Sequence, residues 1–331
     1  MKFSDYMYDW LYGESGYYSK YKEIGKEGDF YTAVSASKFF GGSIAKHIIS
    51  VIDEGFLPKD TTICEIGAHK GYLLADIVQF IYTLRPELLD TLSFAIVERF
   101  DFLQEEQRKY FNESFGDVVQ LKQVKSLKEL DLPNAFFIAN EIFDAFSCEL
   151  IYKDKMGTLV DGKIVFEEDN AWLSEKARKY HKDKGEIAIG YEEFALEMKS
   201  AAKSFEFMTY DYGEMQARPD FSVRIYRDHE VLPLFEEGLD LSDVFASTDI
   251  TYDVTFAHLK DAYEEAGITM IDFKTQALAL VDMGLLELLE MLKEQGGEEM
   301  YTHEVERAKQ LILPSFMGER FKMIRFRTLL D

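Results

Sequence analysis

The chain has 331 residues, of which 47% are hydrophobic and 15% are aromatic, and its formal net charge is −24. This length allows two domains or one large α/β domain with insertions. The acidic charge argues against a nucleic-acid phosphate backbone as the main partner, because such binders need basic patches. It favours a basic peptide or protein partner, with the alternative that the acids only keep the chain soluble.

The cysteines and the apolar segments narrow the class of protein. Cys64 and Cys148 lie in apolar segments and are expected to be core residues. No Cys/His cluster has the spacing of a zinc site, so we expect no metal. The first ten residues carry acids and lack the apolar core of a signal peptide. No uncharged apolar run approaches the roughly 20 residues that span a bilayer. We therefore expect a cytoplasmic protein without membrane insertion.

Residues 1–60 are expected to form an N-terminal helical cap. Their densest cluster is Gly-Asp-Phe-Tyr-Thr-Ala at 28–33, and Gly41 and Gly42 then open an apolar helical pattern. Because this segment precedes the first predicted strand, it could fold over a ligand site as a lid.

Residues 61–76 predict a strand, a glycine turn and a helix. The apolar run 61–66 contains Glu65, the turn contains Gly67, Ala68 and Gly71, and an amphipathic helix is expected at 72–83. In an open α/β sheet such a turn lies where ligands bind, and glycine allows close approach of the backbone. No Gly-Lys-Ser/Thr follows, which excludes a P-loop. An acid before the turn suits a ligand with a cationic amino-acid end, such as S-adenosylmethionine.

A second acid, Glu98, ends the next predicted strand at 92–98. An acidic side chain at this position accepts hydrogen bonds from ribose hydroxyls in doubly wound folds. The distance from the first turn, about thirty residues, suits one βαβ unit. The alternative is that Glu65 and Glu98 are ordinary strand-end acids that face water.

Two further strand ends carry polar clusters. The apolar run 134–140, typical of a central parallel strand, ends in Asn140, Glu141 and Asp144, and the run 204–210 ends in Asp211. An amide and two acids could grip a substituted nitrogen or a guanidinium, which carboxylates bind in bidentate fashion. The alternatives are acids at the start of a helix, where they meet the macrodipole favourably, and a plain turn at Gly213.

The remaining pattern completes an α/β chain. Residues 149–167 alternate in polarity with turn signals at 154–157 and 161–162, which predicts a small β insertion. We expect helices at 100–112, 191–203, 255–266, 275–293 and 299–312, strands near 118–124, 268–272 and 320–327, and irregular structure at 215–254. Alternating strands and helices predict a mostly parallel doubly wound sheet. The domains would be the cap at 1–60 and a Rossmann-like domain at 61–331 with an insertion at about 149–203.

The chain resembles the MidA family of S-adenosylmethionine-dependent methyltransferases, which includes a mitochondrial protein arginine methyltransferase acting in complex I assembly. The matching stretches are 28–33 with Ser35, Phe40 and Gly41; 65–76; Val97 and Glu98 with Gln107; 140–145; 211–213; 249–251 with Val254 and Phe256; Thr275 and Gln276; and 317–322.

The resemblance implies a Rossmann-like methyltransferase core and S-adenosyl-L-methionine as cofactor. It places Gly67, Gly71 and Glu98 at the cofactor. It further implies that 28–32, with Gly28, Asp29, Phe30 and Thr32, and 140–144 line the active site. The family usually has glycine at the position of His69, where a side chain would crowd the cofactor or re-aim the loop.

The sequence leaves three alternative functions to be compared. The first is methylation of an arginine in a protein substrate, with Glu141 and Asp144 holding the guanidinium. The second is a non-catalytic assembly or chaperone-like protein that keeps the fold, which His69 and the acidic surface favour. The third, a nicotinamide-dependent dehydrogenase, is disfavoured by the incomplete glycine fingerprint. The partner and the oligomeric state are left open.

Overall fold

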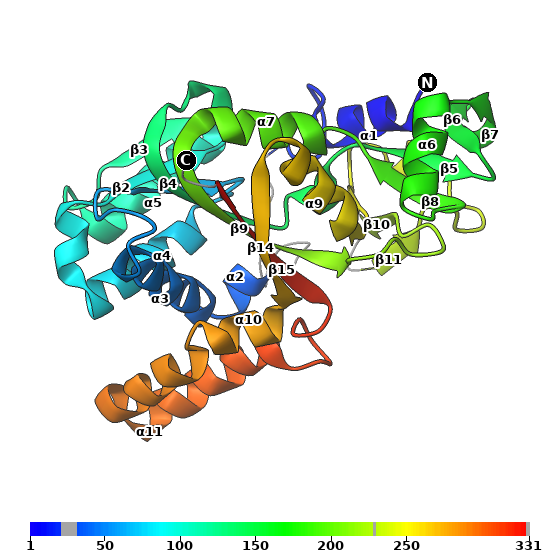
Figure 1. Cartoon of the computed structure of the whole chain (residues 1–331). Coiled ribbons are helices and arrows are strands. Elements are labelled where there is room, and N and C mark those ends of the chain that lie inside the picture. Colours follow the sequence, from blue (N-terminus) through cyan, green and yellow to red (C-terminus); the bar gives the residue numbers. More distant parts are fainter. Residues whose placement is uncertain (21–31, 228–229, 329–331) are drawn as a thin grey trace. The chain divides into compact units, whose positions relative to one another are not determined.

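The structure is a computed structural model that describes residues 1–20, 32–227 and 230–328. Its contacts divide the chain into two compact units (Figure 1). The first unit comprises Met1–Phe30, Glu141–Ala195 and Tyr212–Ala266, and the second comprises Tyr31–Asn140, Leu196–Asp211 and Gly267–Asp331. The predicted cap at 1–60 and insertion at about 149–203 cut the chain at other positions, and that division stays a prediction.

The second unit is built on a mainly parallel sheet with the strand order β14-β15-β9-β4-β1-β2-β3. Neighbours from β9 to β3 pair in parallel, and β14 pairs with β15 antiparallel. All five residues of β1 are buried, as expected for a central strand. The strands are β1 Thr62–Ile66, β2 Ser93–Val97, β3 Leu121–Val124, β4 Leu132–Asn140, β9 Ala202–Glu214, β14 Ile268–Thr275 and β15 Phe321–Thr328.

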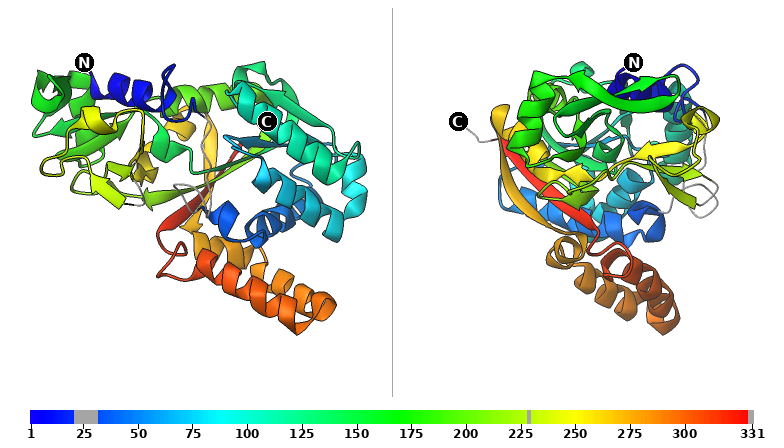
Figure 2. Two further views of the ribbon diagram at one scale, coloured as in Figure 1. Left: turned by 180° about the vertical axis from the view of Figure 1, so that it is seen from behind. Right: turned by 90° about the vertical axis from the view of Figure 1, so that its right-hand side faces the viewer.

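Helices pack against this sheet through apolar faces. Helices α3 and α4 pack against each other, and α10 packs on the β14–β15 pair, whose two strands lie side by side in both views of Figure 2. The helices are α2 Ala33–Ala36, α3 Phe39–Asp53, α4 Tyr72–Leu84, α5 Asp101–Phe115, α10 Gln276–Asp282 and α11 Leu285–Ile312, with short 3-10 turns η1 Pro86–Asp90 and η2 Leu127–Glu129. The predicted mixed α/β fold with a mainly parallel sheet is confirmed.

The first unit contains two small sheets with the orders β7-β6-β5-β8 and β11-β10-β12. The turns joining β5 to β6 and β6 to β7 have two residues each, and Lys153, Asp154, Asp161 and Gly162 all have positive φ. This is the conformation of type I′ hairpins. The strands of these two sheets are β5 Cys148–Tyr152, β6 Lys155–Val160, β7 Lys163–Asp169, β8 Lys184–Ala188, β10 Arg224–Arg227, β11 Glu230–Pro233 and β12 Asp249–Thr251. A further short strand, β13 Val254–Thr255, pairs in parallel with the end of β9.

Short helices complete the first unit, and α7 and β9 each continue from one unit into the other. Its buried apolar cluster includes Ile151 on β5, Leu173 on α6 and Ile187 on β8. The helices are α1 Phe3–Tyr12, α6 Ala171–Lys179, α7 Tyr191–Ala201, α8 Leu241–Val244 and α9 Phe256–Glu265, with the 3-10 turn η3 Phe143–Ala145.

Two expectations from the sequence need correction. Residues 215–254 are irregular only in part, because they also form β10, β11, α8 and β12. The segment 275–293 is not one helix: it is split at Gly284, whose φ of 85° lies in the left-handed region. The predicted helix 299–312 joins α11, which kinks at Gly297 with a φ of 80°. Glycine breaks the helix at both places because it adopts these angles without steric cost.

Candidate active site

Strand register brings three predicted site residues to one edge of the parallel sheet. Ile66 of β1 pairs with Val97 of β2 and with Ala139 of β4. The next residues along these strands are Gly67, Glu98 and Asn140. Neighbouring strands lie about 4.8 Å apart, so the glycine turn, the acid and the amide meet at the carboxyl edge where open α/β sheets bind ligands.

The glycine turn is held in left-handed conformations. The φ angles of Gly67, His69 and Gly71 are 70°, 46° and 79°. A Cβ on Gly71 would lie 3.1 Å from the Phe111 ring, so glycine is required there by both backbone and packing. Histidine occurs at such angles more often than most residues do. His69 therefore has a left-handed backbone conformation that glycine also adopts readily, and its effect on the cofactor stays a prediction.

Glu65 connects β1 to the helix that follows the turn. The backbone N–H of Leu74 in α4 donates to Glu65 Oε2 at 3.0 Å. The carboxyl is buried, and burial raises the pKa of Glu65 to about 8, although the Leu74 hydrogen bond opposes the shift. Glu65 thus has a structural role at the helix N-terminus, in addition to any contact with an amino-acid end.

Glu98 lies directly after β2 with 6% of its surface exposed. Phe100 N–H donates to Glu98 Oε1 at 3.2 Å, which orients the carboxyl group. Burial raises the pKa of Glu98 to about 7, against the hydrogen bond from Phe100. A buried carboxylate fixed at this strand end has the chemistry to accept hydrogen bonds from two ribose hydroxyls.

Gln107 is a residue whose role the sequence did not indicate. It is fully buried in α5, and its Nε2 donates to the His69 carbonyl at 2.6 Å. Gln123 of β3 donates to Gln107 Oε1 at 2.9 Å. The buried residues of α5 are Leu103, Gln107 and Phe111, four apart. A glutamine at an apolar position of that helix was the feature of the sequence that could have indicated a buried polar role for Gln107.

The predicted acceptor-side residues belong to different units. Asn140 ends β4 and Asp211 lies in β9, fully buried, and Asn140 pairs with Tyr210 beside Asp211. Both belong to the second unit, whereas Glu141 and Asp144 belong to the first. Glu141 has a φ of 54°, and Asp144 lies in η3 rather than at the start of an α-helix.

Asp144 is the centre of a polar cluster inside the first unit. The hydroxyl of Tyr212 contacts both Asp144 Oδ2 and Thr251 Oγ1. The Arg224 guanidinium lies over the Tyr212 ring at 4.7 Å. Burial raises the pKa of Asp144 to about 6, with the Tyr212 hydrogen bond opposing. Asp144 is therefore an acidic group, held by Tyr212, that could receive a cationic group.

The remaining predicted site residues are those of the segment before α3 and Ala68 of the glycine turn. Gly28, Asp29 and Phe30 lie outside the described residues. Thr32 is the N-cap of α2 and forms a capping box with Ser35. Ala68 accepts a hydrogen bond from Gly71 N–H at 2.7 Å, which closes the glycine turn.

Residues 1–20, 32–227 and 230–328 contain no group of three or more His, Cys, Asp or Glu side chains placed to hold a metal ion. In the same described part of the chain, none of the helices combines the length and the apolar character needed to cross a bilayer.

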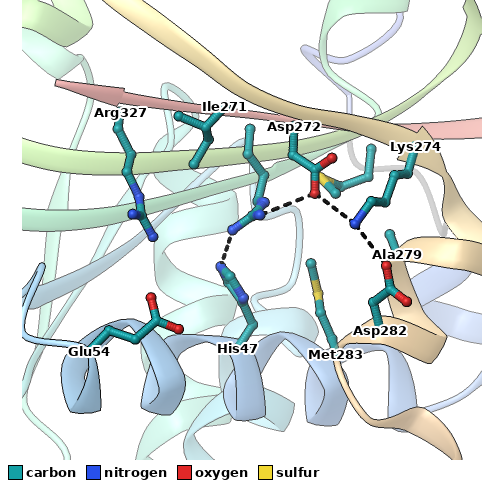
Figure 3. A pocket seen from close by; sticks show the side chains of 11 residues that line it. His47, Glu54, Ile271, Asp272, Lys274, Ala279, Asp282, Met283 and Arg327 are labelled. Atoms are coloured by element: carbon teal, nitrogen blue, oxygen red, sulfur yellow. Dashed lines mark hydrogen bonds and ion pairs between the residues drawn. The ribbon is translucent and has the colours of Figure 1, made fainter. Parts of the chain in front are cut away.

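A pocket of about 380 Å³ lies elsewhere in the second unit, between α3, α10 and the β14–β15 pair (Figure 3). Its charged groups largely pair with each other: Arg325 contacts His47 and Asp272, and Lys274 contacts Asp272 and Asp282. None of the predicted site residues lines it. The lining residues are His47, Glu54, Ile271, Asp272, Lys274, Ala279, Asp282, Met283, Met323, Arg325 and Arg327.

Comparison with known families identifies the family of this chain. Residues 43–274 match the model of a family described as "Putative S-adenosyl-L-methionine-dependent methyltransferase". The chain belongs to this family. The match contains Glu65, the glycine turn, Glu98 and Asn140, and it confirms the predicted family and cofactor, S-adenosyl-L-methionine.

Curated relatives carry a more specific name. The mitochondrial protein arginine methyltransferase NDUFAF7 of Danio rerio is 23% identical over 340 residues, which cover 93% of this chain and 78% of that protein. The Homo sapiens protein of the same name is 22% identical over 349 residues, covering 92% and 75%.

A solved structure supports the fold. A Burkholderia thailandensis protein crystallised with S-adenosyl-homocysteine superposes with a TM-score of 0.84 at 22% identity, covering all of this chain and 88% of that one. A native crystal structure of a Burkholderia thailandensis protein gives a TM-score of 0.80, also at 22% identity.

The residues present fit the family's cofactor. Gly67 is exposed at the sheet edge with a left-handed backbone, so no side chain stands between its peptide and a ligand. Glu98 supplies a fixed acceptor one strand away. The loop amides and this carboxylate are the donor and acceptor types that a nucleoside with an amino-acid end requires.

Proposed function

We propose that this protein transfers a methyl group from S-adenosyl-L-methionine to an arginine nitrogen of a protein substrate. The proposal has two parts, the methyl donor and the methyl acceptor. The main support for S-adenosyl-L-methionine as donor is the strand register that aligns Gly67, Glu98 and Asn140 at one edge of the parallel sheet. The names of the two curated relatives reported above, both protein arginine methyltransferases, support an arginine as the methyl acceptor.

Glu98 and the glycine turn would bind the methyl donor. Glu98 accepts from ribose hydroxyls, and the glycine turn binds the remainder of the nucleoside and its amino-acid end through backbone groups. When bound, S-adenosyl-L-methionine supplies an electrophilic methyl group on a sulfonium. A reaction of this kind depends mainly on holding donor and acceptor in line, which is worth about 7–11 kcal/mol.

Asp144 is the residue that we assign to the acceptor. Its carboxylate is fixed by the Tyr212 hydroxyl, and a carboxylate can bind a guanidinium through two parallel hydrogen bonds. We assign Asn140, Glu141 and Asp211 to the same side of the reaction, as the sequence predicted. The substrate segment would be basic, to match the net charge of −24. The predicted cytoplasmic location is part of the proposal; the curated relatives are named as mitochondrial proteins.

A labelling experiment tests the proposal. The protein is incubated with tritiated methyl donor and a lysate that lacks its gene, and labelled proteins are hydrolysed to identify the methylated residue. We expect label in methylarginine. Label in another residue, or none, would overturn the arginine assignment.

The Asp144→Asn variant separates the two halves of the proposal. It keeps the size of the side chain and removes its charge, so we expect at least a hundredfold loss of methyl transfer. The affinity for S-adenosyl-homocysteine, measured by calorimetry, should stay within twofold of the wild type. Tight binding of that compound by a wild type that labels nothing would instead support the alternative function, a non-catalytic assembly protein.

A further inference from the structure

The glycine turn is tied to α5 and β3 by a series of side-chain hydrogen bonds. Arg108 donates to Gln123 Oε1 at 3.1 Å, Gln123 donates to Gln107 Oε1 at 2.9 Å, and Gln107 donates to the His69 carbonyl at 2.6 Å. Gln123 Nε2 also donates to the Gln104 carbonyl at 2.7 Å. The four contacts all lie within the second unit.

The direction of every hydrogen bond in this series is determined by its first donor, the Arg108 guanidinium, and its last acceptor, the His69 carbonyl. An arginine guanidinium can only donate, and a backbone carbonyl can only accept. Gln123 must therefore turn its oxygen to Arg108 and its nitrogen to Gln107. Gln107 must in turn present its oxygen to Gln123, which leaves its nitrogen for His69. The amide of Gln107 thus has one orientation in which all partners are satisfied.

The residue that receives the last hydrogen bond has a left-handed backbone. His69 has a φ of 46°, and a left-handed conformation is sterically unfavourable for a non-glycine residue. A short hydrogen bond to its carbonyl offsets part of that cost, because the Gln107 side chain is buried. The hydrogen bond therefore favours this conformation of the loop.

We propose that Gln107 is the positioning residue of the cofactor loop: it fixes the His69 peptide, and thereby the backbone from Gly67 to Gly71, before the nucleoside binds. This rests on the proposed function for the identity of the ligand. Gln107 contacts the loop backbone and the Glu98 carboxyl group and not the reacting atoms, so its effect is on affinity through preorganisation.

Gln107→Met tests the proposal, with Gln276→Met as its matched control. Gln276 is also a fully buried glutamine of the second unit, and its Nε2 donates to the Leu311 carbonyl at 2.8 Å. Both variants lose a hydrogen bond from a buried amide to a backbone carbonyl and gain the same side chain, and Gln107→Met also loses the hydrogen bond that Gln107 Oε1 accepts from Gln123. The control therefore measures the cost of losing an amide-to-carbonyl hydrogen bond far from the loop.

The first measurement is amide hydrogen exchange in the ligand-free protein. We expect exchange at residues 67–72 to be at least tenfold faster in Gln107→Met and unchanged in Gln276→Met. The second is calorimetric affinity for S-adenosyl-homocysteine, which we expect to fall tenfold or more in Gln107→Met and less than twofold in the control. Equal behaviour of the two variants in both measurements would overturn the proposal.

Gln123→Met provides a milder version if Gln107→Met does not fold. Gln123 is only half-buried, and its loss leaves Gln107 free to rotate, so we expect the same changes at about a third of the size on a logarithmic scale.

A wild type that fails to bind S-adenosyl-homocysteine would count against the proposed function, whereas the exchange data from the ligand-free protein would still decide the role of Gln107.

Discussion

Glu65 shows how one side chain can carry both a structural contact and a pH dependence. Its carboxyl group accepts the Leu74 N–H and is buried at the start of α4. Burial raises its pKa to about 8. An acid whose pKa is higher in the folded than in the unfolded chain destabilises the fold as pH rises from about 4.5 through the folded value, because the unfolded chain ionises first.

Glu65→Gln removes this ionisation and keeps an oxygen for Leu74. We expect the variant to match the wild type in free energy of unfolding at pH 4.5 and to exceed it by roughly 2–4 kcal/mol at pH 8.5, since each pKa unit is worth about 1.4 kcal/mol. Denaturant unfolding at the two pH values measures the difference. The exposed Glu290, changed to Gln, is the control; a gain that does not vary with pH would contradict the assignment.

The turn between β1 and α4 is the element on which the candidate site depends. The sequence predicted the strand, the turn and the helix, because apolar periodicity and glycine spacing are local signals. Gly71 is both the left-handed residue before α4 and a packing contact of Phe111. The packing contact comes from α5, some forty residues later in the chain, and no local pattern indicates it.

Gly71→Ala and Gly55→Ala separate backbone strain from crowding. Both glycines have a φ of 79°, but a Cβ at Gly55 would have no neighbour within 4 Å, whereas one at Gly71 would meet Phe111 at 3.1 Å. We expect Gly55→Ala to lower the free energy of unfolding by about 1 kcal/mol and Gly71→Ala by roughly 2–3 kcal/mol. Chemical denaturation measures both values.

Cofactor binding gives a second readout for the same pair of variants. Only Gly71→Ala should also weaken the binding of S-adenosyl-homocysteine, because only Gly71 belongs to the loop. Equal stability costs in the two variants would show that crowding by Phe111 is unimportant.

At the scale of the whole molecule, the dominant feature is the charge of −24. A strongly charged protein attracts partners of opposite charge over distances of about a Debye length, and salt shortens that distance. The proposed basic substrate segment would therefore be captured faster at low ionic strength.

The rate of methyl transfer to a basic arginine peptide should fall severalfold between about 20 and 300 mM salt, through a rise in KM rather than a drop in kcat. A peptide of the same length with its lysines replaced by glutamine is the control, and its rate should change little. Initial rates with labelled donor measure both. Identical salt dependence of the two peptides would remove charge from the account of substrate capture.

The sequence by itself determined the α/β class, the order of most elements, the family and the residues that end the strands, because these follow from local periodicity and short motifs. Tertiary structure decided the rest. Strand register aligned Gly67, Glu98 and Asn140, contacts placed Asp144 with Tyr212 and Thr251, and the packing of β3 and α5 directed Gln107 to the His69 carbonyl. These are pairings of residues far apart in the chain, and their energies depend on distances and burial that no local pattern of residues encodes.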